Sequence, residues 1–96
     1  MKKVFQLVES NKHRDRTLEA IKSDIRKYLK RERKKKLPAD ATYWEFECRF
    51  GKSDTEVEEL LAPEIITALD KAHSEEWSEC YVEIISKPVS TKEESI

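Results

Sequence analysis

Residues 43–50 read Tyr-Trp-Glu-Phe-Glu-Cys-Arg-Phe and form the most regular pattern in the chain. Apolar side chains stand at positions 44, 46, 48 and 50, and charged side chains stand at 45, 47 and 49. Successive side chains of a strand point to opposite faces, so this period of two predicts a strand with one buried and one exposed face. It is the clearest strand in the sequence.

Downstream of this strand, residues 51–54 predict a turn that contains the only glycine of the chain. Residues 55–62 are rich in Glu and are compatible with either a helix or a strand. Pro63 interrupts any helix that runs through it, but it suits the first residue of a helix. We therefore favour a short strand at 55–61, paired with 43–50 as a hairpin, followed by a helix from Pro63 to about residue 74.

A second alternating stretch at residues 80–86 predicts the last strand, with Cys80, Val82 and Ile84 on its inner face. Pro88 is expected to end this strand. The polar segment 89–96 is then expected to form a flexible C-terminal tail. Because 96 residues allow only one modest core, we expect a single domain over residues 1–88.

The N-terminal third predicts a short strand at 3–8 and a helix that begins near Asp15. Its apolar residues follow one another at offsets of three and four and form a single stripe: Leu18, Ile21, Ile25, Tyr28 and Leu29. The stripe stops at Leu29, although residues 30–36 are all acceptable helix formers, and Leu37-Pro38 closes the helix. We expect this helix to extend beyond the core by roughly 10 Å.

The predicted order of elements is β-α-β-β-α-β, the split arrangement of ferredoxin-like domains, in which two helices cover one face of a four-stranded antiparallel sheet. The chain is therefore assigned to the α+β class as a two-layer sandwich. If residues 55–61 are helical, the order becomes β-α-β-α-β with a three-stranded sheet. The shared phase of these elements predicts a core of Ile25, Leu29, Trp44, Phe46, Phe50, Leu69, Val82 and Ile84.

The distribution of charge is the feature that narrows function. The chain has 19 Lys and Arg and 20 Asp and Glu, and a formal net charge of -1. Residues 1–36 nevertheless hold fourteen of the basic residues and five acids, a net charge of about +9. Residues 37–96 carry the opposite excess, about -10. A binding surface for polyanions is therefore compatible with this slightly acidic protein.

The basic residues are densest between positions 27 and 36, where seven of ten residues are Lys or Arg. The helix dipole and pairs of opposite charge explain a few of them, but repulsion among seven like charges costs stability. Phosphate backbones favour clustered Lys and Arg because binding releases counterions. The sequence therefore predicts contacts to nucleic acid or to an acidic partner by Lys27, Lys30, Arg31, Arg33, Lys34 and Lys35.

Other kinds of site receive less support. The expected exposed face of the sheet carries Glu45, Glu47 and Glu83, which repel phosphates and disfavour stacking of RNA bases there. Cys48 and Cys80 are not closely spaced with each other or with a histidine, as structural zinc ligands normally are, and their strands are expected at opposite edges of the sheet. We expect two buried reduced thiols and no metal site.

Catalytic motifs are also missing from the sequence. A chain with one glycine cannot form a glycine-rich phosphate loop, and its many acids suit solvated positions. We therefore expect a protein that is not an enzyme and that needs no cofactor. No segment approaches the roughly 18 apolar residues of a membrane-spanning helix, so a cytoplasmic protein is expected.

Four segments carry a resemblance to known sequences: Arg26–Arg33, Leu37-Pro38, Trp44–Cys48 and Tyr81–Ile84. On these segments the chain resembles a small bacterial family of uncharacterised proteins, along nearly its whole length. The resemblance implies a bacterial cytoplasmic origin and a single domain. It implies no activity, and it assigns a role to no residue.

Two hypotheses of different classes follow. The first is a small non-catalytic module that contacts the backbone of RNA, or of the ribosome, through a basic helix at 22–36. The alternative is a protein–protein adaptor or a self-associating domain that pairs this helix with an acidic surface. The response of binding to salt, with and without nucleic acid, and a mass that depends on concentration distinguish the two.

Overall fold

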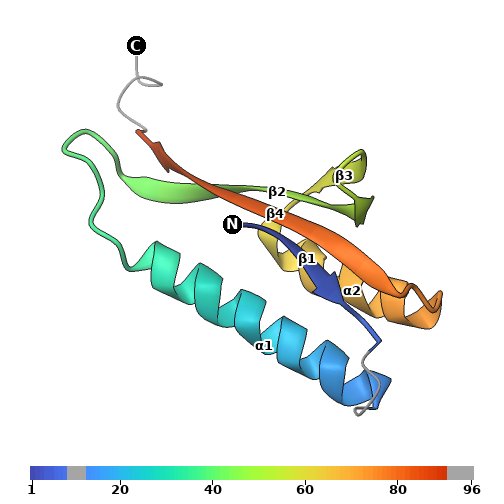
Figure 1. The fold of residues 1–96 in the computed structure, drawn as a ribbon. Coiled ribbons are helices and arrows are strands. Elements are labelled where there is room, and N and C mark those ends of the chain that lie inside the picture. The colour runs from blue at the N-terminus through green and yellow to red at the C-terminus, as the bar shows by residue number, and fades with distance from the viewer. Residues whose placement is uncertain (9–12, 91–96) are drawn as a thin grey trace.

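The computed structural model describes residues 1–8 and 13–90, which form two helices and one four-stranded sheet (Figure 1). Both helices lie on the same face of the sheet, so the protein is a two-layer α+β sandwich. The predicted class and the ferredoxin-like order of elements are confirmed, and the three-stranded alternative is wrong. The elements are β1 (Lys2–Gln6), α1 (Arg14–Arg33), β2 (Tyr43–Ser53), β3 (Glu56–Leu60), α2 (Ala62–Ser74) and β4 (Glu79–Val89).

The strands lie in the order β1-β4-β2-β3, and all neighbours are antiparallel. The two longest strands, β2 and β4, therefore form the centre of the sheet. The sequence predicts these cysteine-bearing strands at opposite edges, and that prediction is wrong. The chain leaves β3 through α2 and crosses over β2, so β4 enters the sheet between β1 and β2.

β4 is longer than predicted, because it continues through Pro88 to Val89. β1 pairs with β4 only from Glu79 to Glu83, so Pro88 lies where one edge of β4 is open and its missing N–H is tolerated. On the other edge, the Val89 carbonyl accepts hydrogen bonds from the backbone N–H (2.8 Å) and the hydroxyl (3.1 Å) of Thr42.

The extra length of β2 and β4 creates a two-stranded extension of the sheet. Residues 43–47 of β2 pair with residues 85–89 of β4, beyond the reach of β1 and β3. We call this extension the β2–β4 ribbon. Val89 of the predicted tail belongs to it, whereas residues 91–96 of that tail lie outside the part of the chain that is described.

The hairpin between β2 and β3 depends on the single glycine. A Cβ atom on Gly51 would lie 1.6 Å from the backbone oxygen of Glu56, so only glycine allows the two strands to approach at this point. The predicted short strand at 55–61 is confirmed as β3. α2 then begins at Ala62 with Pro63 in its first turn, as predicted, and the Leu61 N–H donates to the Glu64 carboxylate (2.8 Å).

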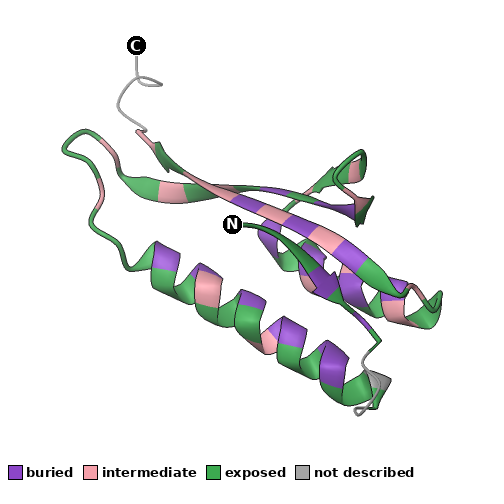
Figure 2. Ribbon diagram, viewed as in Figure 1, coloured by how far each residue is buried: buried purple, intermediate pink, exposed green. Residues whose placement is uncertain are grey.

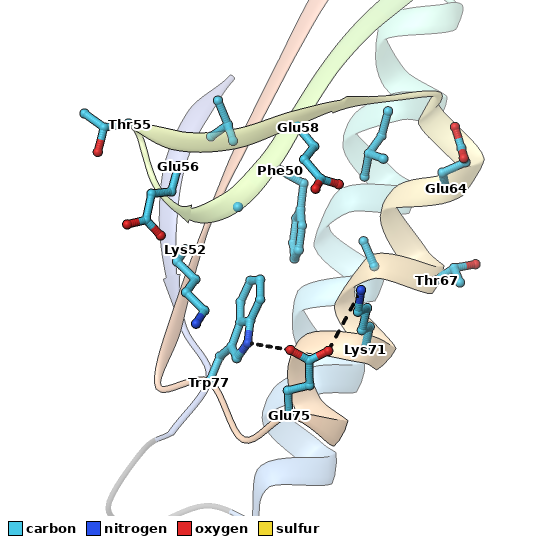
Figure 3. Close-up of a pocket in the computed structure, with 14 residues that line it drawn as sticks. Phe50, Lys52, Thr55, Glu56, Glu58, Glu64, Thr67, Lys71, Glu75 and Trp77 are labelled. Atoms are coloured by element: carbon cyan, nitrogen blue, oxygen red, sulfur yellow. Dashed lines mark hydrogen bonds and ion pairs between the residues drawn. The ribbon is translucent and has the colours of Figure 1, made fainter.

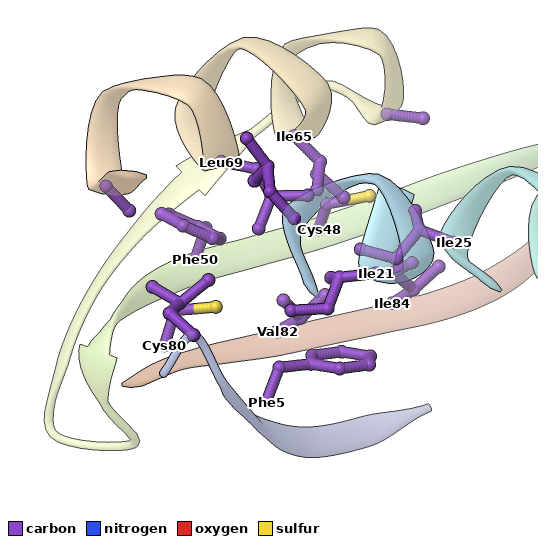
Figure 4. Packing of buried hydrophobic residues seen from close by; sticks show 14 of the residues in the cluster. Phe5, Ile21, Ile25, Cys48, Phe50, Ile65, Leu69, Cys80, Val82 and Ile84 are labelled. Carbon is purple, nitrogen blue, oxygen red and sulfur yellow. The ribbon is translucent and has the colours of Figure 1, made fainter. Parts of the chain in front are cut away.

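The core lies between the sheet and the helices (Figures 2 and 4). Six of the eight predicted core residues are buried, and Phe46 is half-buried against the core. The prediction is wrong for Trp44, because the β2–β4 ribbon extends past the point where the core ends. The buried apolar residues are Phe5, Leu7, Leu18, Ile21, Ile25, Leu29, Cys48, Phe50, Ala62, Ile65, Leu69, Ala72, Cys80, Val82 and Ile84.

Both cysteines are free and buried, as the sequence predicts. Cys48 lies on β2 and Cys80 on β4, and both side chains face the core (Figure 4). Removal from water raises the pKa of the Cys48 thiol to about 11 and that of Cys80 to about 12. Both groups are therefore neutral at physiological pH, and neither is a reactive thiolate.

Phe46 and Phe50 of β2 differ in burial, although the alternating sequence pattern predicts that both lie in the core. Phe50 is 6% exposed and stacks on Trp77, with 5.9 Å between ring centroids. We predict that Phe50→Ala lowers the free energy of unfolding by about 3–5 kcal/mol, as expected for a buried Phe, and that Phe46→Ala lowers it by about half as much. Urea unfolding of both variants tests this, and equal losses would contradict the assigned boundary of the core.

Candidate nucleic-acid interface

The basic end of α1 is held against the β2–β4 ribbon. α1 ends at Arg33, three residues before the predicted end at residue 36, and the chain then turns at Lys34 and Lys35. The indole N–H of Trp44, on the ribbon, donates to the backbone carbonyl of Lys35 at 3.0 Å. The helix extends past its last core residue, Leu29, by about one turn, which is less than the predicted length of roughly 10 Å, and β2 and β4 continue alongside this turn.

Glu32 makes the second connection between α1 and the ribbon. Its side chain is 9% exposed, and its carboxylate accepts a hydrogen bond from the Ser86 hydroxyl at 3.3 Å. The Lys35 ammonium lies 2.6 Å from the same carboxylate. The hydrogen bond from Lys35, and then the bond from Ser86, hold the pKa of the Glu32 carboxyl below its usual value. Glu32 is therefore a buried anion held by Lys35 and Ser86.

The burial of Glu32 removes the only acid from the outer surface of residues 26–36. Lys27, Lys30, Arg31 and Lys34 are spaced by three and four residues, so they share one face of the helix, and all four are exposed. Among the described residues, no side chain forms an ion pair with Lys27, Lys30 or Lys34. This face of α1 is thus uniformly positive.

Two arginines at this end are supported by aromatic rings. The Arg31 guanidinium lies 5.5 Å from the centroid of the Tyr28 ring, and the Arg33 guanidinium lies 5.5 Å from that of Phe46 on β2. Stacking on a ring limits the freedom of a guanidinium but leaves the N–H donors at its edge available. Both groups are therefore partly oriented before any ligand arrives.

Two further lysines of the predicted segment 22–36 behave differently from the rest. Lys22 is buried, and its ammonium pairs with Asp70 of α2 and with Glu19 (3.6 Å), so it joins the helices and does not face a partner. Lys35 is exposed, but Glu32 already partners its charge. The structure brings five of the six predicted contact residues to the basic end as accessible cations: Lys27, Lys30, Arg31, Arg33 and Lys34.

The sequence does not reveal the residues that support this surface. The alternation predicts that both Trp44 and Phe46 lie in the core, yet both also contact the end of α1 from the ribbon. Glu32 is the one supporting residue that the sequence marks out, because it is a lone acid inside a basic run. Its contact with Ser86 joins residues 54 positions apart, which no local pattern shows.

The face of the sheet away from the helices carries acids that are mostly paired. The Lys87 ammonium lies 2.6 Å from Glu47, and Glu83 accepts a hydrogen bond from the Tyr81 hydroxyl at 2.9 Å. Arg49 lies 3.8 Å from Glu59 and 3.9 Å from Glu83. This mixed surface offers no uniform positive region for phosphates.

Residues 1–8 and 13–90 lack the features of two other kinds of site. No group of three or more His, Cys, Asp or Glu side chains lies close enough together there to hold a metal ion. No helix within those ranges is long and apolar enough to span a membrane.

The buried Glu32 predicts a dependence of stability on pH. Its pKa in the folded protein is lower than the ordinary value of 4.5, so its contribution is complete above about pH 4.5 and is lost as the pH falls through the folded-state pKa. We predict that Glu32→Gln lowers stability at about pH 7 and that the difference from the parent protein shrinks by about pH 3. Urea unfolding at both pH values measures this, and a difference independent of pH would contradict it.

Comparison with known proteins places the chain in a family. No curated protein sequence and no solved structure matches it. One family model matches residues 1–95, which is nearly the whole chain. The resemblance noted in the sequence is confirmed to that extent, and the chain belongs to the family described as a family of unknown function, DUF6172.

Proposed function

We propose that this protein is a small non-catalytic module that binds the phosphate backbone of nucleic acid, RNA above all, through the basic end of α1. One observation carries the proposal: the only acid among residues 26–36 is buried, so the exposed side chains there form an uninterrupted positive face. Packing within the protein does not require four exposed cations at this position. A polyanionic partner gives them a role.

The chemistry of the surface suits backbone contacts better than the reading of bases. Lys27, Lys30 and Lys34 provide mobile ammonium groups, while the two stacked arginines provide planar donors that match phosphate oxygens. From Lys27 to Lys34 the face extends for roughly 10 Å along the helix, enough for a few phosphates. Residues 26–36 contain no Asn or Gln, the side chains that pair with adenine edges.

The rest of the molecule favours one orientation of binding. Residues 37–96 have a net charge of about -10 and repel a polyanion, whereas the end of α1 attracts it. Such a protein binds with modest affinity, with little preference for sequence and with a strong dependence on salt. Ribosomal RNA in the bacterial cytoplasm is the partner that this proposal favours.

Charge reversal on the exposed face tests the proposal. We predict that replacing Lys27, Lys30 and Lys34 with Glu weakens binding to single-stranded and double-stranded RNA and DNA alike, by at least about tenfold, because the contacts are to the backbone. If about four phosphates are engaged, log Kd of the parent protein should change with log salt with a slope of about 3 to 4, and the variant should show a much smaller slope. Fluorescence anisotropy at about 50 and about 200 mM salt measures both.

A control with the same change in net charge makes the test specific. Lys2, Lys71 and Lys87 are exposed and lie on other elements, so their replacement with Glu should leave most of the binding intact. Equal losses in the two triple variants would contradict a site on α1. If the parent protein binds none of the four nucleic acids at low salt, the proposal is rejected in favour of the adaptor alternative, in which the same helix contacts an acidic protein.

A further inference from the structure

A second surface, whose chemistry differs from that of the basic end of α1, lies at the edge of the sheet that β3 forms. A cleft of about 710 Å³ opens between β3 and α2 (Figure 3). The aromatic rings of Phe50 and Trp77 line it, together with aliphatic side chains from both elements, including Leu60 of β3 and Ala68 of α2. The cleft is therefore large enough for several side chains of a ligand, and part of its lining is apolar.

Trp77 is held in a fixed position within this cleft. Its ring is nearly parallel to that of Phe50, with an interplanar angle of 16°, and its indole N–H donates to the Glu75 carboxylate at 3.3 Å. The Lys52 ammonium lies 5.3 Å from the ring centroid, and Figure 3 shows Trp77 between Lys52 and Phe50. The exposed side of the indole thus already receives a cation from the protein itself.

A free strand edge borders the same cleft. β3 pairs with β2 on one side, and no described segment pairs with its other side. Alternate residues of an antiparallel strand direct their N–H and C=O groups outward, so the outer edge of β3 presents unpaired backbone groups. Glu58 and Leu60 lie on β3 and line the cleft, so a strand added to this edge would place alternate side chains in it.

The charge around this edge selects the kind of ligand. Residues 53–64 contain five acids and no Lys or Arg. Glu58 is exposed and projects from β3 toward α2 in Figure 3, whereas Lys71 on the opposite wall is 3.9 Å from Glu75 and is therefore already paired. The edge repels nucleic acid and attracts a basic ligand.

We propose that β3 and the adjoining cleft bind an extended, basic segment of another protein, which adds to the sheet as a fifth strand. A Lys or Arg side chain of the ligand takes the place of Lys52 on Trp77 and lies near Glu58. An apolar side chain two positions away packs on Leu60 and Ala68. Residues 27–35 of a second copy do not fit this description, because residues 27–33 are helical and the backbone carbonyl of Lys35 accepts a hydrogen bond from the Trp44 indole.

This inference goes beyond the proposed function, since it concerns a different surface and a different class of ligand. Trp44→Phe leaves Trp77 as the only tryptophan, so its fluorescence reports on the cleft. We expect the tryptophan-free peptide acetyl-Thr-Arg-Thr-Leu-Thr-Lys-amide to produce a saturable change. Glu58→Lys with Glu59→Lys should weaken binding by at least about tenfold, because it removes the complementary charge. No saturable change at low salt would overturn the proposal.

Two controls separate strand addition from simple attraction between charges. Glu45→Lys with Glu47→Lys makes the same change in charge on the β2–β4 ribbon and should leave binding of the peptide within about threefold. Two further peptides carry N-methyl groups on alternate amides, so that only one of them blocks the hydrogen bonds to β3. That peptide should lose binding at least about tenfold, while the other retains it. Equal binding of the two would show that no strand forms and would overturn the proposal.

Discussion

The burial of the Glu32 carboxylate against the β2–β4 ribbon determines the character of the basic end of α1. Glu32 interrupts the basic run in the sequence, and on the outer face it would neutralise part of that surface. Bonds from Ser86 and Lys35 hold it inward, with Lys35 partly neutralising its charge. The exposed side chains among residues 26–36 are then all Lys or Arg. One inward carboxylate therefore fixes the end of the helix and leaves its outer face uniformly positive.

The ribbon that receives Glu32 is itself a consequence of the order of strands. β4 lies in the middle of the sheet, but β1 covers only its first half, so β4 and β2 continue as a pair. That continuation brings Trp44, Phe46 and Ser86 to the end of α1. At the opposite end of β2, the chain turns at residues 54 and 55 into β3, whose outer edge is acidic, and Gly51 allows the two strands to approach closely beside this turn. The same two strands thus support both charged surfaces of the molecule.

Local sequence patterns predict the helices and strands. The limits of the core and the pairing of side chains across the fold depend on contacts between distant segments. The alternation at 43–50 and the position of Pro63 depend only on neighbouring residues, so the sequence predicts β2, β3 and α2. The predicted turn at 51–54 is wrong for its first three residues, because β2 continues to Ser53. Alternation shows which face of a strand a residue occupies but not where the core ends, and Trp44 was misplaced for that reason. The basic residues were found from composition alone. The pairing of Lys22 with Asp70, 48 positions away, and the burial of Glu32 required the packed structure.

The two tryptophans permit a direct measurement of where nucleic acid binds. The indole N–H of Trp44 is bonded to Lys35 at the basic end, whereas that of Trp77 is bonded to Glu75 beside the acidic cleft. Both give separate signals in a ¹H–¹⁵N correlation spectrum, along with the backbone amides. On addition of a single-stranded RNA oligomer, the signals of residues 27–36 and the Trp44 indole should shift, and the Trp77 indole should not. Shifts confined to Trp77, β3 or the outer face of the sheet would contradict the assignment of the basic end of α1 as the binding surface.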